Sequence, residues 1–170
     1  GSLVEVDREA KKNPGTYMRR LTHRMGEPMI RAATMQAMKI LGEQFVPGRS
    51  IKAAIKRGHK TEGRLHSFDM LVEGARTHDD AARYHARYLD AIAAVGARRE
   101  AGAIEQVDGI SVKLSALHPR YHAVKEKSVF DELYPLVLAQ AEAAKAADIG
   151  LCLDAEESDR LIISLKIFER

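Results

Sequence analysis

The stretch GISVKLSALHPRY, residues 109–121, begins with the pattern of a β-strand. Over its first half, apolar and polar side chains alternate: Ile110, Val112 and Leu114 against Ser111, Lys113 and Ser115. Strands that are covered on both faces usually read as continuous apolar runs. The polar face of this strand must therefore meet water, a polar partner or a site, and Lys113 is the first candidate functional residue.

Two further segments read as short strands, RLHSFDML (64–71) and IGLCLDAEE (149–157), and helical patterns separate the three. Thr77 and Asp80 form a capping-box pattern that predicts a long helix with one apolar stripe. A second helix is predicted to begin or kink at Pro135, and Ser158 is predicted to cap a third. Strands that alternate with helices predict a parallel sheet, as in a doubly wound sheet or a (β/α)8 barrel. No G-x-G-x-x-G fingerprint follows a strand, which disfavours a nucleotide-binding Rossmann fold.

The region before the first strand reads differently. Residues 1–14 are polar and unpatterned, and we interpret them as a tag remnant and a mobile arm. Residues 15–63 read as a helical segment, in which Ser50 caps a short helix that Gly58 closes. Residues 64–170 then hold three β/α units.

Each predicted strand carries a charge near its carboxyl end, at Asp69, Lys113 and Asp154, with separations of 44 and 41 residues. The period-two alternation of strands places each charge on the face opposite the apolar residues. If the strands are parallel neighbours, the three charges share one side and one end of the sheet, which in a barrel is the catalytic end. The alternative is a structural salt-bridge network inside the sheet.

A lysine between two aspartates keeps its charge, because its neighbours oppose the effect of burial on the pKa. Such a lysine can offer a cation to an anionic substrate such as a carboxylate. The histidines show no convincing metal-ligand spacing, so no metal site is predicted.

The composition favours a single soluble domain with a cytoplasmic setting. The chain has 170 residues, 45% hydrophobic, with one cysteine, and no apolar run reaches the roughly 18 residues of a membrane span. Residues 1–64 hold 14 lysines and arginines against 6 acidic residues, whereas the remainder is acidic. This asymmetry leaves open a binding or regulatory module that uses the basic helices 15–58 to contact DNA or a membrane.

Five blocks, in the same order along the chain, resemble the proline dehydrogenase domain of the bifunctional proline utilization A (PutA) family. The blocks are GEPMIR (26–31), GEQFV (42–46), SFDMLVEGA (67–75), DGISVKLSALHPRY (108–121) and LDAEESDRL (153–161). The resemblance implies an α/β chain with N-terminal helices followed by the first three β/α units of a truncated (β/α)8 barrel. It also implies FAD-dependent oxidation of L-proline to Δ1-pyrroline-5-carboxylate, with electrons passed to a quinone at the inner membrane face.

The resemblance also implies roles for single residues. Lys113 would bind the carboxylate of proline, Asp69 would line the same pocket, and Asp154 would be the active-site aspartate. Ala155 would approach the flavin through its backbone, and Glu73 would pair with a gating arginine of the last barrel helix.

In the family, that arginine and the main flavin contacts come from parts of the barrel that follow the third unit. We therefore expect this chain alone neither to retain FAD nor to oxidise proline, and its open barrel edge favours self-association. The ribbon-helix-helix segment of some members is not apparent, so DNA binding by this segment is not expected. A different barrel enzyme, in which Lys113 forms a Schiff base with a carbonyl substrate, remains an alternative.

Overall fold

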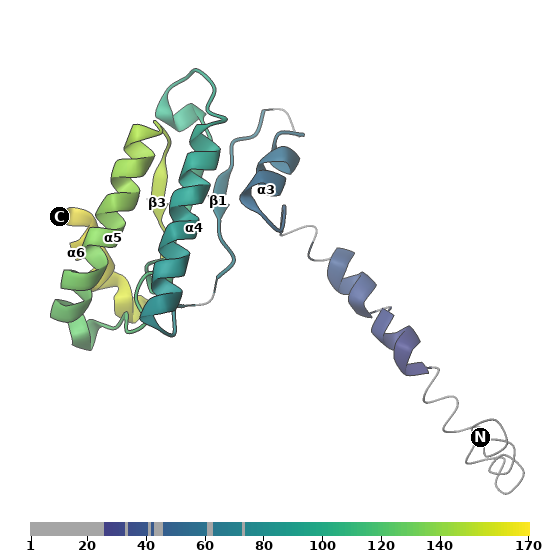
Figure 1. Cartoon of the computed structure of the whole chain (residues 1–170), viewed down its shortest axis with the longest axis horizontal. Coiled ribbons are helices and arrows are strands. Elements are labelled where there is room, and N and C mark those ends of the chain that lie inside the picture. The colour runs from purple at the N-terminus through teal and green to yellow at the C-terminus, as the bar shows by residue number, and fades with distance from the viewer. Residues whose placement is uncertain (1–25, 33, 41, 43–45, 61–62, 73) are drawn as a thin grey trace, which may run out of the picture. The chain divides into compact units, whose positions relative to one another are not determined.

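The computed structural model has two units, residues 1–46 and 47–170. It describes residues 26–32, 34–40, 42, 46–60, 63–72 and 74–170 (Figure 1). In the first unit, residues 26–32 and 34–40 are helical, as the sequence predicted. Several of their large apolar side chains are exposed: Met29, Ile30, Met35, Met38 and Ile40. The predicted arm at residues 1–14 lies outside the described residues.

The second unit is built on three short parallel strands in the order β1-β2-β3 (Figure 1). Their bounds are Ser67–Asp69 for β1, Gly109–Val112 for β2 and Leu151–Leu153 for β3. Phe68 pairs with Ile110, which pairs with Leu151, so the apolar residues stand in one row across the sheet. The parallel sheet and its β/α order confirm the predicted fold class.

Four helices of this unit accompany the strands (Figure 1). Their bounds are Ile51–Gly58 for α3, His78–Gly96 for α4, Glu126–Ala146 for α5 and Leu161–Glu169 for α6. Figure 1 shows α4 and α5 side by side over one face of the sheet, and the contacts place α3 against α4 and α6 against α5.

Side-chain caps fix where α3 and α4 begin. The Ser50 hydroxyl accepts the N–H of Ala53 at 3.3 Å, and the Thr77 hydroxyl accepts the N–H of Asp80 at 3.0 Å. The Asp80 carboxylate accepts the N–H of Thr77 at 3.1 Å, which completes the capping box. Both predicted helix starts are thus confirmed.

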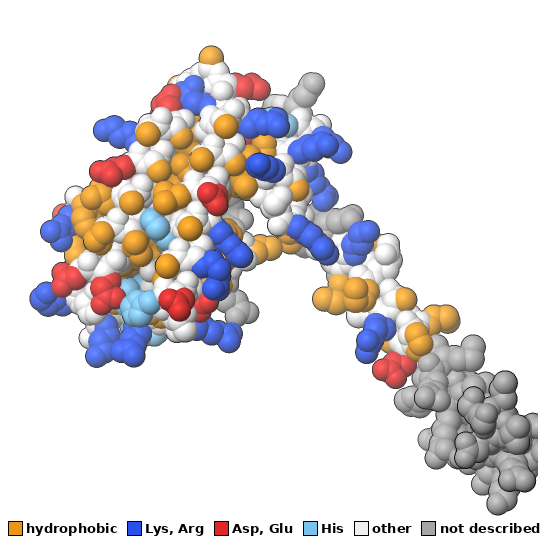
Figure 2. Space-filling view, in the orientation of Figure 1, with side chains coloured by type: hydrophobic (Ala, Val, Ile, Leu, Met, Phe, Trp, Pro, Cys, Tyr) orange, Lys and Arg blue, Asp and Glu red, His pale blue; other side chains and the backbone are white. Residues whose placement is uncertain are grey.

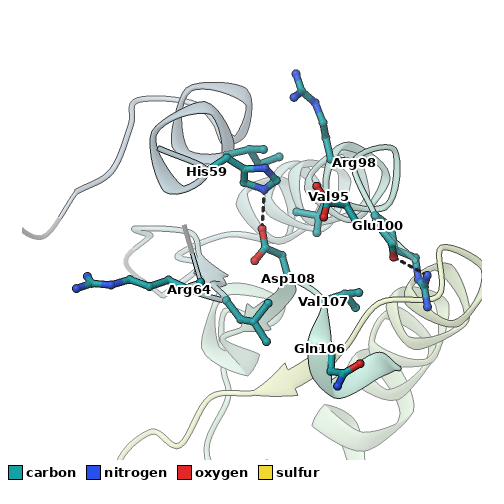
Figure 3. Close-up of a pocket in the computed structure, with 12 residues that line it drawn as sticks. His59, Arg64, Val95, Arg98, Glu100, Gln106, Val107 and Asp108 are labelled. Carbon is teal, nitrogen blue, oxygen red and sulfur yellow. Dashed lines mark hydrogen bonds and ion pairs between the residues drawn. The ribbon is translucent and has the colours of Figure 1, made fainter. Parts of the chain in front are cut away.

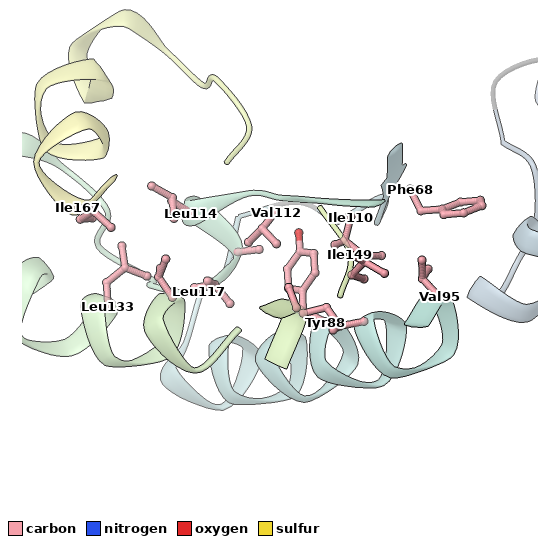
Figure 4. Packing of buried hydrophobic residues seen from close by; sticks show 14 of the residues in the cluster. Phe68, Tyr88, Val95, Ile110, Val112, Leu114, Leu117, Leu133, Ile149 and Ile167 are labelled. Atoms are coloured by element: carbon pink, nitrogen blue, oxygen red, sulfur yellow. The ribbon is translucent and has the colours of Figure 1, made fainter. Parts of the chain in front are cut away.

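The hydrophobic core lies between the sheet and helices α4 and α5 (Figure 4). From the strands, Phe68, Ile110 and Val112 point into it, and Tyr88 and Ile92 meet them from α4. On the opposite face of the sheet the side chains at 67, 69 and 152 are exposed. One sheet face is therefore packed in the core and the other is open at β1 and β3. In β2 itself the predicted alternation is only partly seen, because Ser111 on the second face is also buried.

A helix start at Pro135 and a cap by Ser158 are both contradicted, whereas a kink at Pro135 stays a prediction. Helix α5 begins at Glu126 and runs through Pro135, so the proline neither opens nor ends it. Ser158 opens a 3-10 turn, Ser158–Arg160, and its side chain makes no capping hydrogen bond there or at the start of α6. No helix in the described part of the chain is both long and apolar enough to cross a membrane.

Candidate active site

The three predicted charges stand at the carboxyl ends of the three strands. Asp69 is the last residue of β1, and Lys113 and Asp154 directly follow β2 and β3. The N–H of Asp154 donates to the carbonyl of Val112 at 2.9 Å, which keeps Asp154 level with Lys113. Asp69 pairs with Ser111, so it lies two residues deeper on the same face as Lys113.

Lys113 bridges the two carboxylates. Its ammonium hydrogen-bonds to Oδ2 of Asp69, and its Nζ lies 3.0 Å from Oδ2 of Asp154. The side chains remain partly open to solvent, at 25% exposure for Lys113, 35% for Asp69 and 38% for Asp154. The matched positions in the sequence thus meet in space as one cluster, which we call the Lys113 cluster.

Burial by itself lowers the pKa of the Lys113 ammonium, but the hydrogen bonds to Asp69 and Asp154 outweigh it and raise the pKa above its ordinary value. The Lys113 N–H donates to the hydroxyl of Tyr88 at 3.1 Å, which anchors the backbone of the lysine to α4. Burial raises the pKa of Tyr88 to about 12, so this phenol stays neutral. The cluster therefore presents a fixed cation between two anions.

Hydrogen bonds connect the three loops that follow β1, β2 and β3. The N–H of Ala75 donates to the carbonyl of Ser115 at 2.9 Å, and the N–H of Ser115 donates to Oε1 of Glu156 at 2.9 Å. The other carboxylate oxygen of Glu156 lies 3.2 Å from Arg160. Our sequence reasoning missed this role of Glu156, whose signal was only the acidic run 154–157.

Of the two remaining predicted site residues, the structure describes Ala155 but not Glu73. Ala155 is exposed and follows Asp154 directly, beyond the end of β3. Glu73, the predicted gating residue, lies outside the described residues. Neither assignment is tested by the geometry, and both remain predictions.

His118, in the loop after β2, makes its hydrogen bonds outside the Lys113 cluster. Only 5% of its side chain is exposed, its Nδ1 accepts the N–H of Arg120 at 3.1 Å, and its Nε2 lies 3.2 Å from Glu132 of α5. With Nδ1 as acceptor, Nε2 carries the proton and donates to Glu132. His118 therefore fixes its loop to α5. Among the described residues, no group of three His, Cys, Asp or Glu is placed to hold a metal.

A cavity of about 280 Å³ lies at the other end of the sheet (Figure 3). It is lined by residues that precede β1 and β2, among them Arg64 and Asp108, and by residues of α3 and α4. Asp108 Oδ2 lies 3.0 Å from Nε2 of His59, and Asp108 Oδ1 accepts the N–H of His66 at 2.8 Å. This cavity is separate from the Lys113 cluster, because the whole length of β2 lies between them.

Solved structures resemble the whole arrangement. A crystal structure of a mutant of Bradyrhizobium japonicum proline utilization A is 47% identical, with a TM-score of 0.69, and the match covers 89% of this chain and 16% of that one. A proline utilization A structure from Bdellovibrio bacteriovorus is only 18% identical but has a TM-score of 0.74, which supports the fold alone. The predicted fold of three barrel units is confirmed.

One prediction about partners is corrected. Residues 1–45 match the model of a family described as "DNA-binding domain of Proline dehydrogenase". We had not expected DNA binding in this segment, because we saw no ribbon-helix-helix pattern. Most of the matched residues lie outside the described part of the chain.

The remaining comparisons are with curated proteins, which cover 100% and 88% of this chain, and with a second family model. Bifunctional protein PutA of Salmonella typhimurium is 43% identical over 172 residues, and PutA of Rhizobium meliloti is 49% identical over 152. The chain spans 13% and 12% of the lengths of these curated relatives. Residues 51–170, which contain the whole cluster, match the model of the proline dehydrogenase family. The chain belongs to the proline dehydrogenase family.

Proposed function

We propose that the Lys113 cluster is the part of a proline dehydrogenase active site that binds the substrate amino acid, L-proline. The observation that carries this proposal is the lysine held between two aspartates on the open sheet face, at the carboxyl ends of three parallel strands. In barrels of parallel strands, catalysis occurs at that end. A lysine that served only the fold would have no need to face the open side.

The charges of the cluster suit a zwitterion. One lysine and two aspartates sum to a single negative charge, so a lone carboxylate gains little by approaching. Proline carries both a carboxylate and a secondary ammonium. Its carboxylate can bind Lys113 while its ammonium faces Asp69 or Asp154, so each new contact replaces part of an existing ion pair. This arrangement favours amino acids over simple carboxylic acids, and a simple amine lacks the carboxylate that would engage Lys113.

FAD would supply the oxidation of the C–N bond, since the flavin carries the redox chemistry in this family. We assign a flavin contact to the backbone of Ala155, as the resemblance implies. The described residues do not enclose such a group, because the Lys113 cluster is partly open to solvent. The flavin contacts therefore have to come from other parts of a complete enzyme. We assign Glu73 to a gating ion pair and a membrane quinone to the role of electron acceptor, as the resemblance implies.

The Schiff-base alternative fits the cluster less well. A lysine that attacks a carbonyl must be deprotonated, and enzymes reach that state by lowering its pKa. The two aspartates raise the pKa of Lys113 and hold its proton. The cluster is therefore built for charge recognition and not for covalent attack.

Two measurements test the proposal. The purified chain is expected to show no flavin absorbance and no turnover of proline with a dye acceptor, and clear turnover would contradict this. Substrate recognition is tested separately by NMR titration of the isotope-labelled chain with L-proline and with pyrrolidine, which lacks the carboxylate. We expect proline alone to shift the Lys113 and Asp154 resonances, and Lys113→Met to abolish the shifts. Equal effects of both ligands, or shifts that survive in Lys113→Met, would refute the site.

A second candidate function is DNA binding by residues 1–45, supported by the family match over that segment. Lys11 and Lys12 are neighbouring cations in it. If the segment holds DNA through its phosphates, Lys11→Gln/Lys12→Gln should weaken the binding of a fluorescent duplex at low salt. A chain that binds no duplex at 50 mM salt would exclude this function.

A further inference from the structure

A row of basic residues follows one side of α3, outside the segment that matches the DNA-binding family. Its members, which we call the basic ridge, are Arg49, Lys52, Lys56 and Lys60. Lys52 and Lys56 lie four residues apart on one side of α3, Arg49 precedes the Ser50 cap, and Lys60 follows in the turn after the helix. All four side chains are exposed.

The opposite side of α3 is anchored. Ala54, Ile55 and Gly58 are buried, and Ala54 and Ile55 belong to the hydrophobic core. The Ser50 cap fixes the start of the helix. The ridge is therefore carried by a packed helix, so little conformational freedom of its backbone is lost when a ligand binds.

In the part of the chain that the structure describes, no acidic residue neutralises the positive charge of the basic ridge. Helix α3 contains none, and within the described residues the structure pairs no carboxylate with any ridge member. The nearby Asp108 is 15% exposed and is already engaged by His59 and His66. The positive charge of α3 therefore faces solvent.

Further cations extend this surface beside the cavity at the base of the sheet. Figure 3 shows the guanidinium groups of Arg64 and Arg98 pointing outward from the cavity, away from its centre. In Figure 2, blue Lys and Arg side chains gather over α3 and the adjacent end of α4. The result is an outward-facing basic surface and not an enclosed pocket for a small anion.

We propose that the basic ridge binds the phosphate backbone of duplex DNA. The eight residues of α3 rise over about 12 Å, and duplex DNA carries one negative charge per about 1.7 Å of its axis. Each ridge cation can therefore meet a phosphate. Contacts to phosphates position a protein on a duplex without reading its sequence, so the proposed contribution of the ridge is to affinity and not to sequence choice.

An anionic membrane is the competing partner. A helix that lies in a membrane interface inserts an apolar face between the lipids. The apolar face of α3 is used in the core, where Ile55 is only 3% exposed. Because the ridge side has no large apolar residue to insert, the observations favour a partner recognised by charge alone.

The test measures duplex binding by the full chain, through fluorescence anisotropy, between 50 and 200 mM salt. The ridge variant is Lys52→Gln/Lys56→Gln. The matched control is Lys125→Gln/Lys145→Gln, which removes two exposed lysines from and beside α5 with the same change in net charge. Each phosphate contact contributes about 0.9 to the slope of log K against log salt, so loss of two contacts should lower the slope by about 1.8. The control should leave the slope unchanged.

The outcomes separate this proposal from the one for residues 1–45. A lower slope in the ridge variant but not in the control supports the ridge, whatever Lys11→Gln/Lys12→Gln does. An unchanged slope in the ridge variant overturns the proposal, even if Lys11→Gln/Lys12→Gln loses affinity. An equal loss in ridge and control variants also overturns it, because net charge would explain the effect. The proposal is also overturned if the chain binds phosphatidylserine vesicles through the ridge but does not bind the duplex.

Discussion

At the scale of single residues, Lys113 has more negative charge around it than it needs for neutrality. Either aspartate alone would balance the ammonium, and the second leaves the cluster with a net negative charge. Removing the lysine would leave two carboxylates facing each other on a partly open surface. Partly buried ion pairs lie between exposed pairs, worth 0 to about 1 kcal/mol, and buried pairs, whose disruption costs about 3–5 kcal/mol.

We therefore expect Lys113→Met to lower the free energy of unfolding at pH 7 by about 1–2 kcal/mol. The folded state raises the pKa of Lys113 above the ordinary value of 10.5. The contribution is thus fully present below that pH and is lost as the pH rises through the folded-state pKa. In urea denaturation, the difference in the free energy of unfolding between wild type and Lys113→Met should be smaller above pH 11 than at pH 7.

Lys125→Met is the control for this experiment, because Lys125 is exposed. It should change the free energy of unfolding by no more than about 0.5 kcal/mol, with no dependence on pH in this range. A gap between wild type and Lys113→Met that stays constant from pH 7 to above pH 11 would contradict the assigned ion pairs.

Gly109, at the start of β2, lies so close to the backbone of Gly150 that there is no room for a side chain. A Cβ at this position would lie 2.7 Å from the carbonyl oxygen of Gly150, which also accepts the N–H of Ile110 at 2.9 Å. We expect Gly109→Ala to lower the free energy of unfolding by about 1–3 kcal/mol, because the β2–β3 ladder must shift. Gly150→Ala, where nothing lies within 4 Å of the new Cβ, is the matched control. Equal losses in thermal denaturation would contradict this explanation.

Sequence reasoning located the Lys113 cluster because strand alternation and matched spacing are regular. Once the strands are parallel, residues at equivalent positions meet, and Asp69, Lys113 and Asp154 do. The link from Glu156 to Ser115 could not be predicted in this way. It depends on the path of irregular loops, which have no period from which to argue.

At the scale of elements, α5 shows how packing overrides a local preference. A proline in a helix interior removes one backbone hydrogen bond and crowds the preceding turn, at a cost of about 3 kcal/mol. For that reason we placed a helix start or kink at Pro135. The helix nonetheless runs from Glu126 to Ala146, because Val129 and Leu133 before the proline, and Val137 after it, are all buried in one core.

Pro135 is exposed, so its replacement should remove the cost without loss of packing. We expect Pro135→Ala to raise the free energy of unfolding by about 1–3 kcal/mol, because the carbonyl of Asp131 regains its N–H partner. Glu142→Ala, at another exposed position of α5, should change stability by less than about 0.5 kcal/mol. A proline variant no more stable than the control in urea denaturation would show that the helix already accommodates the proline without cost.

Helix α6 shows the limit of predicting which face is buried. The spacing of Leu161, Leu165 and Phe168 puts them on one side of the helix and would predict that this side is buried, but they are 51%, 53% and 76% exposed. The buried residues are Ile163 and Ile167, which pack into the core. A helix that is apolar almost all round gives no signal for its inner face, and only its neighbours decide it.

At the scale of the whole molecule, the second unit leaves two kinds of surface uncovered within the described residues. The outer edges of β1 and β3 pair with no further strand, and the outer side of α6 presents its exposed apolar residues. Unpaired strand edges and contiguous apolar patches both favour association between chains. The same openness leaves the Lys113 cluster partly accessible to solvent, so both predictions, inactivity and self-association, depend on the same structural feature.

We expect the purified chain to self-associate, with a mass by light scattering that exceeds one chain and rises with concentration. Leu165→Glu/Phe168→Glu places two charges on the exposed side of α6 and should shift the mass towards a single chain, because a charge buried in an apolar contact without a partner is costly. Val124→Glu/Ile104→Glu adds the same charge at positions 89% and 46% exposed, outside α6, and should leave association intact. A one-chain mass for the wild type at every concentration would show that the open edges and the α6 patch do not drive association. Equal dissociation of both variants would instead point to general charge repulsion, and the α6 patch would lose its assigned role.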